Sequence, residues 1–261
     1  MSDREHVGTE REDAQIEPGG GPYWATSAGS MQAIAAVDAD VARRAFSSGR
    51  GIALGGGSPS GWPGAITGRA WGSLAAFEAD VRSGALPAGL RVAMYDPERW
   101  KYTPVEEQRD PVAAIGRFVA RCRELGYISM VTPYPRLVTV RGARFRAGRG
   151  EAEEDAYLRS GIAAAAGAAD ICETQAQRLE SDPQAYRAFV AATAEQARTA
   201  NPRVVMLSGL STSPGFAATP RMLLEAFTSV RDVVDGHYVS LSKGRHPEVL
   251  TAFLRMVLDA E

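Results

Sequence analysis

The sequence predicts an α/β fold, a single (β/α)8-type barrel, and three observations support this. Short apolar runs alternate with amphipathic helical patterns about seven times from residue 23 to the C-terminus. Proline or glycine stands at most junctions between a run and the next helix. Neither glycine-rich turn fits a nucleotide-binding fingerprint, which weakens the main alternative, a doubly wound open sheet.

Length and composition indicate one domain. The 261 residues are 45% hydrophobic and 23% charged, which is ordinary for a globular chain of this size. Residues 1–21 are polar, end in a glycine run and have no signal-peptide core. They are expected to form a disordered tail, followed by the barrel over residues 22–261 of a cytoplasmic protein.

Local patterns place the elements of the first half of the barrel. Residues 23–27 form a short strand, and a helical stripe follows over residues 30–47. A second strand over residues 51–54 enters a Gly/Pro-rich loop over residues 55–64, and residues 74–81 are helical. This leaves seven clear strands in the whole chain where a barrel has eight. Either residues 65–67 hold a missed strand or the barrel is incomplete.

The middle of the chain carries the clearest end signals. Residues 90–95 and 127–132 are apolar runs closed by Asp-Pro and by proline. Between them, the helix over residues 111–125 starts with a proline after a capping aspartate and is followed by glycine. A basic loop over residues 141–149 then leads to a helix that ends at residue 166.

The remaining elements repeat these signals. Asp-Pro or Thr-Pro opens two of the helices, and a histidine followed by proline opens the last. The expected order is a strand over residues 170–177, a helix over 182–200, a strand over 204–207, a helix over 219–230, a strand over 238–241 and a helix over 246–258.

The strand over residues 170–177 is unusually polar. A strand between two helices normally belongs to a buried sheet and is apolar on both faces. Alternation here places Ile171, Glu173, Gln175 and Gln177 on a single face. That face therefore carries one carboxylate and two carboxamides. Because burying such groups without partners costs several kcal/mol, this face is expected to line a cavity. An edge strand with a solvated face is the alternative.

The strand–helix rhythm from Tyr23 to the C-terminus resembles that of TIM-barrel enzymes in general. The stretch Tyr-Asp-Pro-Glu-Arg-Trp over residues 95–100 is loosely similar to the acidic strand ends of barrel glycoside hydrolases. The resemblance implies a site at the C-terminal ends of the strands and in the loops that follow them. It implies no residue roles.

Two carboxylates are the candidate catalytic residues. Asp96 and Glu173 end alternate strands, which feed the same layers of a barrel. Such a pair can divide acid and base roles if the two environments separate their pKa values. Asp96 could instead be a turn residue before proline, and Glu173 could pair with a core arginine. The expected substrate-binding residues share positions at strand ends or in the following loops: Gln175, Tyr95, Trp100, Tyr134, Trp62, Ser208 and Tyr238.

The sequence favours no cofactor, although Asp96 and Glu173 could together hold a hard divalent cation. Histidines are few and lack ligand spacing, so a zinc site is not expected, and His237 is read as structural. Cys122 and Cys172 are read as buried free thiols.

These features favour a barrel hydrolase that performs carboxylate acid–base chemistry on a small, hydroxylated, carbohydrate-like substrate. Aromatic side chains at the mouth suit sugar faces, and they equally suit a cationic intermediate. A cyclase or lyase of bacterial specialised metabolism is therefore one alternative, and a non-catalytic ligand-binding barrel is the other. A net charge of -2 and the lack of a long apolar run predict no nucleic-acid or membrane partner, and the oligomeric state stays open.

Overall fold

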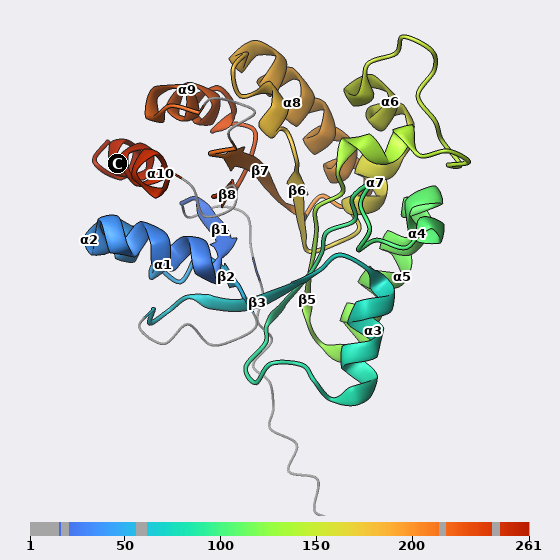
Figure 1. Cartoon of the computed structure of the whole chain (residues 1–261), viewed down its shortest axis with the longest axis horizontal. Coiled ribbons are helices and arrows are strands. Elements are labelled where there is room, and N and C mark those ends of the chain that lie inside the picture. The colour runs from blue at the N-terminus through green and yellow to red at the C-terminus, as the bar shows by residue number, and fades with distance from the viewer. Residues whose placement is uncertain (1–15, 17–20, 56–61, 214–217, 242–245, 261) are drawn as a thin grey trace, which may run out of the picture.

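The computed structural model describes residues 16, 21–55, 62–213, 218–241 and 246–260, and it shows a closed barrel of eight parallel strands (Figure 1). Each strand pairs with its neighbours in sequence, and β1 pairs with β8. The expected TIM-barrel fold is confirmed, and the eighth strand is β3, which begins within the suspected segment. The strands are β1 Tyr23–Ser27, β2 Gly51–Leu54, β3 Ile66–Trp71, β4 Val92–Tyr95, β5 Ile128–Val131, β6 Ile171–Thr174, β7 Val205–Ser211 and β8 Gly236–Ser240.

Helices surround the barrel (Figure 1). They are α1 Ala28–Val37, α2 Ala39–Phe46, α3 Leu74–Ser83, α4 Val105–Arg109, α5 Pro111–Leu125, α6 Glu153–Arg159, α7 Ile162–Ala166, α8 Pro183–Ala200, α9 Pro220–Val230 and α10 Pro247–Leu258, with 3-10 turns η1 Pro135–Thr139 and η2 Gln177–Leu179. The proline starts of α5, α8 and α9 follow side chains that accept from the first turn, as expected. No helix in the described ranges is long and apolar enough to cross a membrane.

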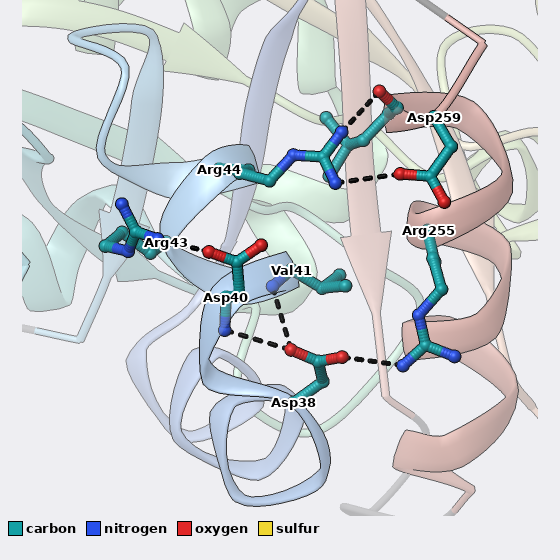
Figure 2. Close-up of polar contacts among 8 residues, drawn as sticks. Asp38, Asp40, Val41, Arg43, Arg44, Arg255 and Asp259 are labelled. Carbon is teal, nitrogen blue, oxygen red and sulfur yellow. Dashed lines mark hydrogen bonds and ion pairs between the residues drawn. The ribbon is translucent and has the colours of Figure 1, made fainter.

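The single helix expected over residues 30–47 is wrong, because Asp38 divides it into α1 and α2. One Asp38 carboxylate oxygen accepts hydrogen bonds from the backbone of Asp40, at 2.9 Å, and of Val41, at 3.1 Å, and so caps α2. The other oxygen pairs with Arg255 of α10 at 2.6 Å (Figure 2). Arg44 of α2 pairs with Asp259 at the end of α10 at 2.8 Å. Asp38 and Arg44 thus connect the start of the chain, at α2, to α10, the last helix.

Other boundaries also differ from expectation, and β7 runs to Ser211, four residues beyond the expected strand. The helix expected to end at residue 166 is two helices, α6 and α7, because Gly161 between them adopts a left-handed conformation with φ of 79°. The strand expected over residues 170–177 ends at Thr174. A turn in which Ala176 donates to the Thr174 carbonyl then starts η2.

Side-chain alternation creates an inner and an outer apolar layer. The outer layer lies between the strands and the helices and includes both cysteines, which are buried and free as expected. The inner layer fills the barrel with Tyr23, Ala25, Ile52, Leu54, Ile66, Val92, Met94, Ile128, Met130, Ile171, Val205 and Leu207. Ile16 packs against this inner cluster, so the predicted tail contributes at least one contact to the barrel.

Candidate functional site

The polar site lies at the mouth of the barrel, directly beyond the inner apolar cluster. Met94 and Ile171 belong to that cluster, and side chains alternate along a strand. The next inward positions are therefore Asp96 after β4, Glu173 on β6 and Gln175 after β6. The structure confirms the expectation that Glu173 points into the barrel.

Asp96 is held by two neighbouring strands. Its Oδ1 atom accepts hydrogen bonds from Thr132 Oγ1 and from Gln175 Nε2, both at 2.9 Å. Gln175 Nε2 also donates to the Thr132 carbonyl at 2.7 Å. These bonds join the ends of β4, β5 and β6. Burial raises the pKa of Asp96 to about 6, although the two hydrogen bonds lower it.

Glu98 adds a second carboxyl group from the same loop. It is partly buried, and burial, followed by the nearby charge of Asp96, raises its pKa to about 7. Its backbone N–H donates to Thr103 Oγ1 at 3.2 Å, and Trp100 Nε1 donates to the same oxygen at 2.8 Å. Thr103 in turn donates to the Gly72 carbonyl after β3. The loop that carries Glu98 is thus fixed to the rim.

Glu173 is 1% exposed and lies deepest of the three carboxyl groups. Burial, followed by the negative charges of Asp96 and Glu98, raises its pKa well above the usual range. Its only hydrogen bond among the described residues comes from Gln177 Nε2, at a long 3.4 Å. Nowhere in the described ranges does a basic side chain form an ion pair with Asp96, Glu98 or Glu173. The core-arginine alternative for Glu173 therefore has no support.

Gly209 on β7 makes room for this arrangement. A Cβ atom at this position would lie 2.3 Å from both Glu173 Oε1 and Gln177 Nε2, far inside van der Waals contact. Only glycine therefore lets the two side chains cross the face of β7. In sheet register Gly209 pairs with Tyr238 of β8, so the carboxyl group extends toward the next strand.

Tyr238 shares the electrostatic environment of the carboxyl groups. Burial, followed by the charges of Asp96, Glu173 and Glu98, raises the pKa of its hydroxyl above the usual range. The described part of the chain contains no group of three His, Cys, Asp or Glu side chains arranged to hold a metal ion.

Two of the expected binding residues lie on the other face of the sheet. Tyr95 is fully buried in the outer layer, and its hydroxyl donates to Glu107 Oε2 at 2.7 Å. Ser208 is also fully buried, and its Oγ lies 2.8 Å from His237 Nδ1. Each residue precedes an inward position by one, and one step along a strand reverses the face.

Fewer aromatic side chains lie at the mouth of the barrel than the sequence predicted. Trp24 and Trp71 belong to the outer layer, and Trp62 packs against it. Trp100 does lie at the rim, where its ring meets Tyr102 edge-on with centroids 5.2 Å apart. Tyr102 is 61% exposed, so this pair presents an open aromatic edge.

Tyr134 marks the adjacent part of the rim. Burial raises the pKa of its hydroxyl, while the charges of Arg178 and Arg136 lower it and that of Glu98 raises it. Both arginines share the carboxylate of Glu153. Tyr134 therefore stands between the carboxyl groups of the mouth and a pair of cations on the surface.

Sequence reasoning gave too little weight to Glu98 and Gln177 and did not identify Glu180. Glu98 stands two residues after Asp96, and that spacing could have indicated a second inward carboxyl group. Glu180 is fully buried; Ser211 N donates to its Oε1 at 2.6 Å, and its Oε2 has no partner in the described ranges. Burial raises its pKa to about 9. Nothing in the local sequence distinguishes Glu180 from a surface glutamate.

Comparison with known proteins assigns the chain to no family. No family model matches the chain, and no curated protein matches its sequence. Among solved structures it is similar to a protein of Bacteroides thetaiotaomicron provisionally assigned as an alpha-L-fucosidase, at 10% identity over 70% of this chain with a TM-score of 0.44. The chain spans 60% of that protein.

The catalytic domain of a family GH18 chitinase from the fern Peteris ryukyuensis is similar at 14% identity, over 80% of this chain and 73% of its own, with a TM-score of 0.45. The carboxyl transferase domain of pyruvate carboxylase from Rhizobium etli has 11% identity over 92% of this chain and 46% of its own, with a TM-score of 0.38. Barrels of unrelated function share such levels of likeness, so function rests on the site.

Proposed function

We propose that this barrel is an enzyme that uses the carboxyl groups at its mouth for acid–base chemistry on a small, hydroxylated, carbohydrate-like substrate. One observation carries the proposal: Asp96, Glu98 and Glu173 lie close enough to interact electrostatically, none has a cationic partner in the described ranges, and all three have raised pKa values. A structural carboxylate is normally paired, whereas groups poised near neutral pH suit proton transfer.

The three environments suggest separate roles. Burial and the nearby negative charges favour the protonated form of Glu173 and raise its pKa well above the usual range, so it suits the role of proton donor. Asp96, with a pKa of about 6, is mostly ionised at pH 7 and suits a base or nucleophile. Glu98, with a pKa of about 7, is divided between both forms and can exchange protons with either group.

The exposure of the three carboxyl groups agrees with these roles. Asp96 and Glu98 are partly exposed, so a substrate can contact them directly. Glu173 lies deeper, and its hydrogen bond from Gln177 Nε2 is a long 3.4 Å. Gln175 and Tyr238 offer hydrogen bonds to hydroxyl groups, and the Trp100–Tyr102 edge offers an apolar face to a sugar ring.

The test is a product analysis. Aryl glycosides and unsubstituted oligosaccharides are incubated with the full chain and with Glu173→Gln, and products are identified by mass spectrometry. Asp259→Asn, which makes the same carboxyl-to-amide change in an exposed pair at the end of α10, is the matched control. Hydrolysis products that need Glu173 but not Asp259 support the proposal. Products that lack one water would favour a lyase, and saturable binding without turnover would favour a binding barrel.

A further inference from the structure

A second cavity lies at the end of the barrel opposite the mouth. Its volume is about 550 Å³, within the range typical of small-molecule sites. It is bounded by the chain before β1, by the start of β8, and by the last turns of α9 and α10. The lining comprises Gly21, Pro22, Leu224, Phe227, Thr228, Arg231, Val234, Asp235, Gly236, His237, Met256, Val257 and Ala260.

The walls of this lower cavity combine apolar and polar surface in nearly equal parts. Leu224 and Phe227 line it from α9, and Met256, which is 43% exposed, lines it from α10. The ring centroid of Phe227 lies 4.5 Å from that of His237, which in turn lies 5.4 Å from Trp24. The rings of Phe227 and His237 line the cavity, with Trp24 packed behind them, and they suit an aromatic or extended aliphatic body.

The imidazole ring of His237 lines the cavity wall. His237 is 2% exposed, and its Nδ1 is engaged with Ser208 Oγ at 2.8 Å. Its Nε2 forms no hydrogen bond with any described residue. Burial lowers the pKa of His237 to about 3, so the imidazole is neutral under ordinary conditions. A neutral ring nitrogen in a cavity can form a hydrogen bond with a polar ligand atom.

One positive charge in the lining is also unpaired. Arg231 forms no ion pair with any described residue. Its basic neighbours differ: Arg198 pairs with Asp235 at 3.1 Å, and Arg187 pairs with Asp232. Since the Asp235 carboxylate is already satisfied, the charge left for a ligand at this cavity is positive.

We propose that the lower cavity binds a small amphipathic anion, an aromatic or aliphatic carboxylate. Its apolar body lies between Phe227 and Met256, and its carboxylate lies beside Arg231. This site is separate from the proposed catalytic site, because the two lie at opposite ends of the strands.

The test measures binding to the full chain by isothermal titration calorimetry. Naphthalene-2-carboxylate is the probe, and its uncharged amide is the matched ligand. Arg231→Gln should weaken binding of the carboxylate about tenfold, as loss of one charged hydrogen bond does, and should leave binding of the amide unchanged. Arg221→Gln removes the same charge from the other end of α9, where Arg221 is exposed and pairs with Glu225, and should change neither affinity.

A cavity-filling variant provides an independent check. Thr228 lines the cavity from an exposed helical position, so Thr228→Trp should fold normally, as judged by its melting temperature, and abolish binding of both probes. Failure of the wild type to bind the carboxylate at millimolar concentration would overturn the proposal. So would equal affinities in wild type, Arg231→Gln and Thr228→Trp, or a dimer in sedimentation that the probe does not dissociate, because a second copy would then cover this face.

Discussion

Replacing Asp96 with asparagine tests whether this residue is an acid–base group or a turn residue. Both hydrogen bonds to the carboxylate go to Oδ1, and asparagine keeps an oxygen that can accept them. The substitution therefore removes mainly the charge and the titrating proton. If Asp96 takes part in proton transfer, turnover should fall by roughly a hundredfold or more.

The same substitution should raise the free energy of unfolding. The gain should appear only above about pH 4, where the Asp96 carboxyl group of the unfolded chain releases its proton. Because the folded-state pKa of Asp96 is raised from 3.8 to about 6, the folded protein retains a proton that the unfolded chain releases. Stability of the wild type is therefore lost as pH rises from about 4 to about 6. At about 1.4 kcal/mol for each pKa unit the loss is at most about 3 kcal/mol, and partial exposure reduces it to about 1–3 kcal/mol.

Urea unfolding at pH 7.5 and at pH 4 measures this directly. Asp96→Asn should be more stable than the wild type at pH 7.5 and equal to it at pH 4. Asp259→Asn, with an exposed surface pair, should show no gain at pH 7.5. A variant that is less stable at pH 7.5 and keeps normal turnover would refute both the raised pKa and the catalytic role, and would show that Asp96 closes a turn.

Three further substitutions test the surroundings. Glu173→Gln should lower turnover about a hundredfold and keep or raise the melting temperature; a destabilised variant with normal turnover per folded molecule would end the catalytic claim. Gly209→Ala should destabilise by about 1–3 kcal/mol and lower turnover, because its methyl group displaces Glu173 and Gln177; normal turnover would show that their placement is unimportant. Ile16→Ala should lower the unfolding free energy by about 1 kcal/mol or more, and an unchanged midpoint in urea would show that its packing is dispensable.

The fold could be predicted from the sequence where local signals and tertiary packing agree. The helices that begin at Pro111, Pro183 and Pro220 have the expected bounds, because an N-cap side chain and a proline act within one turn. The break at Asp38 was not predicted, because its carboxylate caps α2 and also pairs with Arg255, far away in sequence. The β3 strand was weakly indicated, since Gly68 and Arg69 interrupt its apolar pattern.

The site was predictable only in part. Alternation along β6 predicted the inward face of Glu173, because the period of two is fixed by the backbone. Tyr95 and Ser208 were selected only for their positions at strand ends, without alternation, and both lie on the outer face. The space for Glu173 depends on Gly209 of the next strand, and a contact between strands leaves no signal in the local sequence.

The inner apolar cluster divides the barrel into two chemically separate ends. Met94, Met130 and Leu207 are almost completely buried within it, between the carboxyl groups above and the chain before β1 below. This cluster of aliphatic side chains, with Tyr23 at its lower end, separates the two ends of the barrel. Changes at the two ends should therefore be additive, since they share no contacts. Selection could then alter the chemistry of the mouth while the opposite end kept its own ligand, and a chain of this length could hold two independent specificities.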